Sequence, residues 1–393
     1  MANLLFKSIR KISGPFISLV TLVLCLVAAE LFLEFFAPVP DPYASYKLIE
    51  HNNYINLDHV FNKRVRTQAE EGMPGVQGIN YFTTNNFGFR GGYLVRPKPA
   101  NEYRIFMIDG STLECFFLDD SQSIDAVLEN GLRKYASGGL VVRAYNASKS
   151  GARLDDNISL LVHRIVHLKP DMIILLSGIN ELFGSIGGQD YLHRVKDKTN
   201  ISSGVLLKML LCEFQIPRRI YYLAKRQLPK TDKQILEEIP MEFNLKERVA
   251  LCALVPATDT CPRVDLESYR NNLKVIIGIG RVFGIKLIFL TQPSTWNSQI
   301  DPMAKKYHWM LYNYHSRLKY REDFMDQALG QYNDAMRQIA RQYSVPLYDL
   351  ARIMPKSLEY FYDDCHFNVK GAEIAGEGLN SFLHKNNLLP QEK

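Results

Sequence analysis

The sequence predicts an α/β protein in which a five-stranded parallel sheet lies between two helix layers, preceded by one N-terminal transmembrane helix. Three observations support this prediction: a long apolar segment opens the chain, five short apolar runs follow from residue 104 onward, and helical patterns separate these runs. Unbroken apolar strands are typical of a parallel sheet that is buried on both faces. Strand–helix alternation predicts the three-layer α/β/α arrangement.

The first element is the apolar segment, which extends from about residue 12 to residue 36 and contains Glu30 and Glu34. A single helix needs about 20 residues to cross a bilayer. Cationic residues precede the segment and none follows it until Lys47, which predicts a cytoplasmic N-terminus. The alternative is a cleaved signal peptide, but the run exceeds the usual apolar core of such peptides and no clear small-x-small cleavage site follows it.

These features divide the N-terminal part of the chain. We expect residues 1–11 to be a cytoplasmic tail, residues 12–37 to be a transmembrane signal anchor, and the remainder to be periplasmic or extracellular. Residues 38–100 are rich in Pro, Asn, Tyr and Gly and show little periodicity. We interpret them as a juxtamembrane segment that packs on the main domain.

The main domain is predicted over residues 101–393. Its strands are expected at 104–108, 141–145, 172–176, 286–290 and 345–348. The helix after the first strand is predicted to be capped by Ser121 and to carry Ile124, Leu128, Leu132 and Tyr135 on one face. Further helices are expected between the later strands, at about 158–168, 269–284 and 332–344, and a last one at about 370–382. Residues 183–264 break the alternation and are interpreted as an insertion that forms a lid or lies against the membrane.

Composition narrows the function classes. The net charge of +6 is modest for 393 residues, and the basic residues are scattered, so no nucleic acid partner is expected. The cysteine and histidine spacings match no zinc site, and no metal or cofactor is predicted. Cys252 and Cys261 bracket a short loop in a compartment that permits disulfides, and we predict a bridge between them.

Polar clusters follow the predicted strands, where ligands of such sheets bind. They are Asp109-Gly110-Ser111 after the first strand, 146–151 after the second, 177–182 after the third, and 362–371 before the last helix. A serine nucleophile needs a base, an acid that orients the base, and oxyanion donors. Ser111, His366 and Asp363 supply the nucleophile, base and acid, and the Asp-x-x-His spacing lets the last two meet locally. The predicted donors are the N–H groups of Ser111 and Gly151 and the side-chain amide of Asn180.

The four clusters, in this order, resemble the SGNH or GDSL hydrolase family, whose blocks supply Ser, Gly, Asn and His in turn. The match covers roughly residues 101–385; "SGINEL" fits the Gly-x-Asn-Asp/Glu block, and "DDCHFN" fits Asp-x-x-His-Pro-Asn with Phe367 in place of Pro. The resemblance implies a flavodoxin-like fold, a triad of Ser111, Asp363 and His366, and an oxyanion site formed by Ser111, Gly151 and Asn180. "NNFGFRG" upstream of the serine is similar to membrane-anchored bacterial members.

One position departs from the family pattern. Asp109 occupies the place where glycine is customary, and a carboxylate near an oxyanion is unfavourable unless it is paired or turned away. Less specific interpretations also exist. Ser111 could cap the following helix, and an aspartate near 363 could cap the last helix and leave His366 at the surface. Cys365 is interpreted as a packing residue.

The resemblance and the anchor together predict an extracytoplasmic, membrane-anchored serine esterase that removes O-acyl groups, chiefly acetyl, from a surface or exported polysaccharide or a lipid. The first alternative is an O-acetyltransferase that uses the same triad, with a polysaccharide export or acyltransferase partner. The second is a non-catalytic scaffold or glycan-binding protein of an export system. Hydrolysis and transfer differ only in the nucleophile that the pocket admits, which the sequence leaves open.

Overall fold

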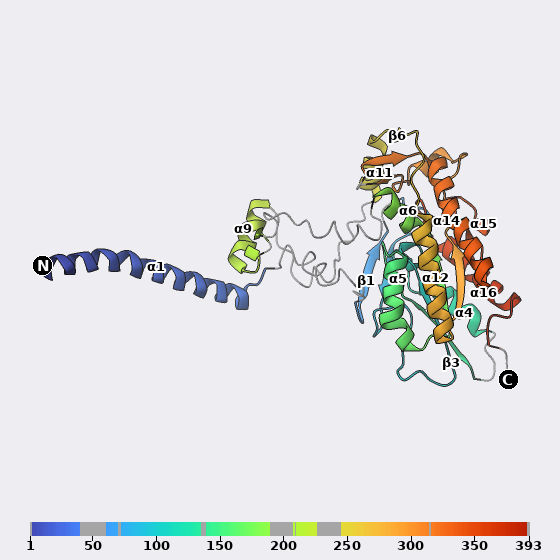
Figure 1. Cartoon of the computed structure of the whole chain (residues 1–393), viewed down its shortest axis with the longest axis horizontal. Helices are drawn as coiled ribbons and strands as arrows, with labels where there is room; N and C mark the ends of the chain where they lie inside the picture. The colour runs from blue at the N-terminus through green and yellow to red at the C-terminus, as the bar shows by residue number, and fades with distance from the viewer. Residues whose placement is uncertain are drawn as a thin grey trace. The chain divides into compact units, whose positions relative to one another are not determined.

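The computed structural model describes residues 2–39, 60–69, 72–134, 139–188, 207–208, 210–225, 245–313 and 316–390. Its contacts divide the chain into two units (Figure 1). One unit comprises Met1–Asn53 and Lys198–Pro240, and the other comprises Tyr54–Asp197 and Met241–Lys393. The region predicted as a single insertion is therefore divided between the two units.

The smaller unit contains helices α1 (Ala2–Phe36) and α9 (Gln215–Lys225). Among the described residues, one helical stretch is long and apolar enough to cross a membrane: Phe16–Phe36, 21 residues of α1, with no part of it buried in the protein. At 1.5 Å per residue, 21 residues extend about 32 Å, which matches the hydrocarbon core of a bilayer. This agrees with the predicted span by length and composition.

The larger unit contains the predicted five-stranded parallel sheet. Its strands are β3 (Glu102–Ile108), β4 (Val141–Asn146), β5 (Met172–Ser177), β7 (Lys286–Thr291) and β10 (Leu347–Tyr348). The order is β10-β7-β5-β3-β4, with every neighbouring pair parallel. Counted along the chain, this is the order 2-1-3-4-5 of flavodoxin-like sheets. The predicted fold class is confirmed, although the last strand is two residues shorter than expected.

Two groups of helices flank this sheet (Figure 1). In one group, α4 (Ile124–Arg133) packs against α16 (Val369–Lys385); in the other, α12 (Leu266–Phe283) packs against α5 (Leu154–Leu160) and α14 (Glu322–Tyr343). Ile124, Leu128 and Leu132 are buried as the helical spacing predicted. The cap is different: the residue before α4 is Ser123, while the Ser121 hydroxyl bonds Asp119 Oδ1 at 3.0 Å. Tyr135 lies outside the described residues.

Shorter elements complete this unit. A hairpin of β1 (Arg64–Gln68) and β2 (Ile79–Thr83) precedes the main sheet, and β6 (Ala257–Thr258), β8 (Tyr312–Asn313) and β9 (Leu318–Tyr320) form a small second sheet. The remaining helical segments are α3 (Ser111–Glu114), a π-helix (Leu161–Ile165), a 3-10 helix (Val166–Leu168), α6 (Ile179–Ile186), α11 (Leu245–Leu254), α13 (Pro302–Lys305) and α15 (Leu350–Ile353).

The predicted disulfide is absent. Cys252 is a buried free thiol on α11, whereas Cys261 is exposed, with its Sγ 3.6 Å from Gln327 Oε1. The Cys252 thiol therefore lies in the protein interior, whereas the Cys261 thiol lies at the surface beside α14. A sequence separation of nine residues, which suggested the bridge, does not determine the direction in which each side chain points.

Candidate active site

Ser111 lies at the carboxyl end of β3, next to the point where the strand order reverses. Chain-consecutive strands leave β3 on opposite sides, with β4 on one edge and β5 on the other, and crevices at such points are the usual ligand sites of these sheets. Gly110 is the residue before α3, and Ser111 is its first residue. The Ser111 hydroxyl does not cap the helix, because its Oγ lies 2.8 Å from His366 Nε2.

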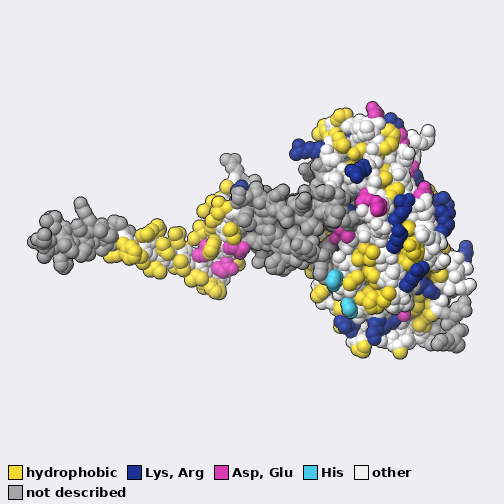
Figure 2. Space-filling view, in the orientation of Figure 1, with side chains coloured by type: hydrophobic (Ala, Val, Ile, Leu, Met, Phe, Trp, Pro, Cys, Tyr) yellow, Lys and Arg dark blue, Asp and Glu magenta, His cyan; other side chains and the backbone are white. Residues whose placement is uncertain are grey.

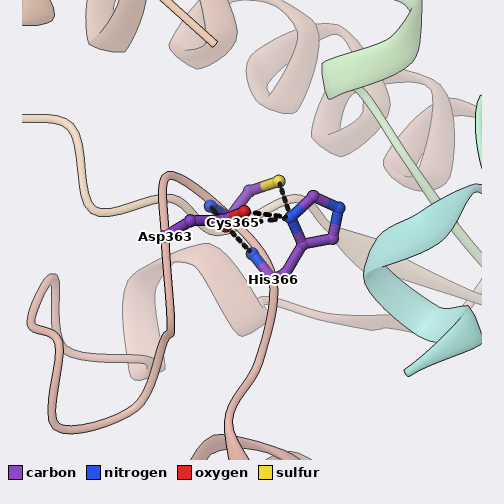
Figure 3. Close-up of side chains that lie close together, drawn as sticks. All are labelled: Asp363, Cys365 and His366. Carbon is purple, nitrogen blue, oxygen red and sulfur yellow. Dashed lines mark hydrogen bonds and ion pairs between the residues drawn. The ribbon is translucent and has the colours of Figure 1, made fainter. Parts of the chain in front are cut away.

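His366 and Asp363 form a buried pair on the loop between α15 and α16 (Figure 3). The imidazole Nδ1 lies 2.9 and 2.7 Å from the two carboxylate oxygens of Asp363. The backbone N–H groups of Cys365 and His366 also donate to Asp363 Oδ1, at 3.0 and 2.9 Å. The last helix is instead capped by Asn368, which accepts from Gly371 N. The interpretation of Asp363 as a helix cap and His366 as a surface residue is therefore wrong.

The charges of this pair are mutually stabilised. Burial alone would lower the pKa of His366, but the Asp363 carboxylate and Cys365 outweigh it and hold that pKa well above its usual value. Burial alone would raise the pKa of Asp363, but its attraction to His366 and the hydrogen bonds it accepts hold that pKa low. An imidazole in this setting gains stability on accepting a proton, which is what a general base does as it deprotonates a nucleophile.

Cys365 completes the group drawn in Figure 3. One ligand atom from each of Asp363, Cys365 and His366 lies within 4.8 Å of the others, a grouping that could hold a metal ion. Burial raises the pKa of the Cys365 thiol to about 11, so that the thiolate form that metals bind is disfavoured. Its Sγ contacts Met310 Sδ at 3.5 Å. The donor set fits a Ser-His-Asp arrangement with a packed thiol better than a metal centre.

Two tryptophans hold the aspartates of this loop, a feature that the sequence analysis missed. Trp309 Nε1 donates to Asp363 Oδ2 at 3.0 Å, and Trp296 Nε1 donates to Asp364 Oδ1 at 2.8 Å. These are the two tryptophans of the chain. The Trp309 ring is also nearly parallel to the His366 ring, with centroids 6.5 Å apart. A buried indole N–H requires an acceptor, so both tryptophans after the fourth strand were a signal for a buried polar partner.

Asn180, one of the predicted oxyanion donors, lies beside the turn that carries the nucleophile. Asn180 is the second residue of α6, which follows β5, and its Nδ2 donates to the Ala152 carbonyl at 2.8 Å, which leaves a second amide N–H for a ligand. A Cβ added to Gly110 would lie 1.9 Å from Asn180 Nδ2 and 3.2 Å from that carbonyl. Gly151, the neighbour of Ala152, is exposed and has φ +75°, a conformation that favours glycine. Gly110, the neighbour of Ser111, and Asn180 therefore border one place, and the Ala152 carbonyl links it to the Gly151 turn.

Glu181 fixes the geometry of this side. Its carboxylate accepts from Ser177 Oγ at 2.9 Å, Gly178 N at 3.1 Å and Leu154 N at 2.8 Å. These contacts tie the end of β5 and the start of α6 to the start of α5, the helix that follows Gly151. Glu181, the acidic residue of the "SGINEL" block, thus holds in place the backbone that positions the Asn180 side chain.

Asp109, the position that departs from the family pattern, is buried against this site. Its side chain is 4% exposed, and its Oδ2 has no hydrogen-bond partner among the described residues. Burial is the main cause that raises its pKa well above the usual value, and the nearby Glu181 adds to it. A protonated carboxyl is neutral, so Asp109 in this form does not repel an oxyanion.

The Asp109→Asn variant is expected to become more stable than the wild type as pH rises. Because the folded-state pKa of Asp109 is raised, proton binding to this carboxyl stabilises the folded wild type. That stabilisation is complete below the unfolded-state pKa, about 4, and is lost as pH rises through the folded-state pKa. The free energy of unfolding then falls by up to about 1.4 kcal/mol per pH unit. Asparagine does not titrate, so the variant keeps its free energy of unfolding over this range as far as this position is concerned. Thermal unfolding from pH 4 to pH 9 should show melting temperatures that diverge. Asp259→Asn, at an exposed carboxylate, is the control, and parallel curves for Asp109→Asn would contradict the assignment.

Comparisons with known proteins add solved structures of low similarity. No family model matches the sequence, and neither does any curated protein. An acetylxylan esterase from Geobacillus stearothermophilus matches at 14% identity and a TM-score of 0.40, over 72% of this chain and 94% of that one. A lipase/acylhydrolase from Enterococcus faecalis matches at 14% and 0.39, over 74% and 100%. An α/β hydrolase enzyme from the metagenome of Lake Arreo, Spain, matches at 14% and 0.40, over 74% and 97%.

Proposed function

We propose that this protein is a membrane-anchored serine esterase. The observation that carries the proposal is the continuous chain of contacts from Ser111 Oγ through His366 to Asp363, at 2.8 Å and then 2.7 Å. A serine, a histidine and an aspartate in this geometry form the arrangement that activates a serine for acyl transfer on many unrelated folds. All three are the residues that the sequence analysis selected.

The residues divide the reaction among themselves. His366 Nε2 takes the Ser111 proton as Oγ attacks the ester carbonyl, and Asp363 stabilises the imidazolium that forms. The N–H groups of Ser111 and Gly151 and the Asn180 amide bind the oxyanion. His366 then gives the proton to the leaving alcohol, and an acyl-serine remains. A water molecule, deprotonated by His366, attacks this acyl-serine; His366 then returns the proton to Ser111 Oγ as the C–O bond breaks, which releases the acid and free Ser111.

The proposed anchoring and location rest on the N-terminal segment. The apolar helix Phe16–Phe36 is proposed to span the membrane with the cationic N-terminus in the cytoplasm, so that the catalytic unit lies in the periplasm or outside the cell. Its substrates are then proposed to be O-acetyl groups of a surface or exported polysaccharide, in line with the resemblance of the four sequence blocks. This choice of substrate rests on the similarity of these motifs to those of the resembled family.

Acetate release by the purified full chain tests the proposal. We expect the full chain in detergent to hydrolyse p-nitrophenyl acetate faster than p-nitrophenyl palmitate and to release acetate from an O-acetylated polysaccharide. A preference for palmitate would indicate a lipid substrate. Acetyl transfer to an acceptor glycan that exceeds acetate release would instead support the transferase alternative. Failure of a fluorophosphonate to label Ser111, together with no activity, would leave a non-catalytic scaffold.

The Trp309→Phe variant tests the positioning of Asp363. The indole N–H stabilises the carboxylate charge, so its loss should strengthen the hold of Asp363 on the His366 proton and raise the pKa of His366 further. We expect the acid limb of the kcat/KM profile to move to higher pH, with a roughly tenfold lower value at neutral pH. Trp296→Phe, which removes the donor to Asp364, is the matched control and should leave that limb in place. Identical limbs in both variants would refute a positioning role for Trp309.

A further inference from the structure

The smaller unit is held together by polar contacts between the end of α1 and the start of α9. The Glu30 carboxylate accepts from the backbone N–H groups of Gln215 and of Ile216, the latter at 3.0 Å. Gln215 is fully buried; its Nε2 donates to Glu34 Oε2, and its Oε1 accepts from Val39 N, both at 2.7 Å. Both glutamates of the apolar segment therefore bind the first residues of α9, at the helix terminus that favours negative charge.

The arginines of α9 face the same junction. Arg218 donates to the carbonyls of Cys212, at 2.6 Å, and of Val39, at 3.1 Å. Arg219 donates to the Ala37 carbonyl. Both arginines are only partly exposed. The polar face of α9 is thus directed at the end of α1 and satisfies two carbonyls just beyond its last residue, those of Ala37 and Val39.

Beside this polar face, α9 carries exposed apolar side chains. Ile220 and Leu223, three residues apart, are 60% and 77% exposed. The described residues just before α9 add Leu207, Leu210, Leu211 and Phe214, each about half exposed. In Figure 2, hydrophobic side chains likewise predominate on the visible part of α1. Polar groups at the junction and apolar groups outside it are the reverse of the arrangement expected in water. Each large apolar side chain left exposed to water forgoes about 1.5–3 kcal/mol of stabilisation that burial would give.

The contacts at this junction also place the start of α9 next to the C-terminal end of α1. Glu30 and Glu34 lie in the last two turns of Phe16–Phe36, and Figure 1 shows α9 beside that end of α1. If Phe16–Phe36 spans the hydrocarbon core, these turns lie at its outer boundary. Tyr221 and Tyr222 are on α9, and tyrosine is enriched at this depth. Amphipathic helices at such a boundary lie in the plane of the interface with their apolar face toward the acyl chains.

We propose that residues 207–208 and 210–225 belong to an interfacial membrane element, in which the apolar side chains of α9 contact lipid acyl chains beside the outer end of the anchor. The occupant of this face is the lipid bilayer. The inference rests on the proposed membrane anchoring and is independent of the esterase reaction. It also assigns a role to Glu30 and Glu34, which bind α9 at the edge of the bilayer.

Depth-dependent quenching of introduced tryptophans tests this proposal. The full chain is reconstituted in phosphatidylcholine vesicles that contain lipids brominated near the headgroup side or deep in the acyl chains. Leu223→Trp reports on α9, Val23→Trp reports on the centre of the proposed span, and Val282→Trp is the matched control on α12, at a position 81% exposed. The wild-type chain supplies the background, because Trp296 and Trp309 are both buried in the other unit.

We expect the fluorescence added at position 223 to fall by about half with shallow bromines and less with deep ones, as for an interfacial helix, while position 282 stays unquenched. Quenching at 23 without quenching at 223 would overturn the proposal and leave the anchor in place. No quenching at either position would refute the anchor itself. Position 223 shielded from both bromolipid and aqueous acrylamide would show that a second copy of the chain covers the face, which also overturns the proposal.

Discussion

Ser111→Ala is expected to lower kcat for p-nitrophenyl acetate by at least about 10⁴-fold, the scale of nucleophile removal in serine hydrolases. The reason is the 2.8 Å contact between Ser111 Oγ and His366 Nε2, which has no substitute once the hydroxyl is gone. His366→Ala should cost about as much, and the double variant should cost little more, because the two residues act as a unit.

The control for this experiment is Ser121→Ala, which removes an exposed hydroxyl from the loop before α4 and should leave kcat unchanged. Circular dichroism of each variant establishes that the fold is retained. Equal low rates in wild type and Ser111→Ala would mean that the observed hydrolysis is not catalysed by this serine, and the esterase assignment would fail.

Asn180→Ala is expected to lower kcat by about 10²- to 10³-fold, the effect of deleting one oxyanion donor. The substitution removes the Nδ2 that lies beside Gly110 and bonds the Ala152 carbonyl. Because the donor acts on the charge that develops in the transition state, KM should change much less than kcat. Asn271→Ala, at an exposed position on α12, is the matched control.

Gly110→Ala should produce a similar loss by a different route. Its added Cβ would overlap Asn180 Nδ2 at 1.9 Å, so the amide must move away from the nucleophile. A variant that retained full kcat in either case would show that Asn180 does not bind the oxyanion.

Features that depend on local sequence were predicted well. Each strand of the sheet is a short apolar run, and β5 is buried at all six positions, which is why periodicity located it. The Asp363–His366 contact is equally local, because three residues of chain suffice to bring the side chains together. Gly110 and Asn180 meet because the strands that present them are neighbours in the sheet.

The features that were missed depend on long-range contacts. Trp309 meets Asp363 across 54 residues, and Gln215 meets Glu34 across 181 residues. No periodicity encodes such pairs, so a buried indole or a glutamate in an apolar helix shows only that a partner exists. The predicted Cys252–Cys261 bridge was wrong for a related reason: closeness in sequence does not determine which way each thiol points.

The base and the residue that orients it belong to one short loop, whereas the nucleophile belongs to the sheet. A displacement of that loop relative to β3 would therefore carry His366 and Asp363 together, and their mutual contacts would survive. Within the triad, only the Ser111–His366 contact would open, and a misplacement of about 1 Å can cost 10²-fold in rate. The two indoles tether this loop, so that damage to them would lower the rate through the alignment of the acid–base pair with the nucleophile, in addition to the effect of Trp309 on the pKa of His366.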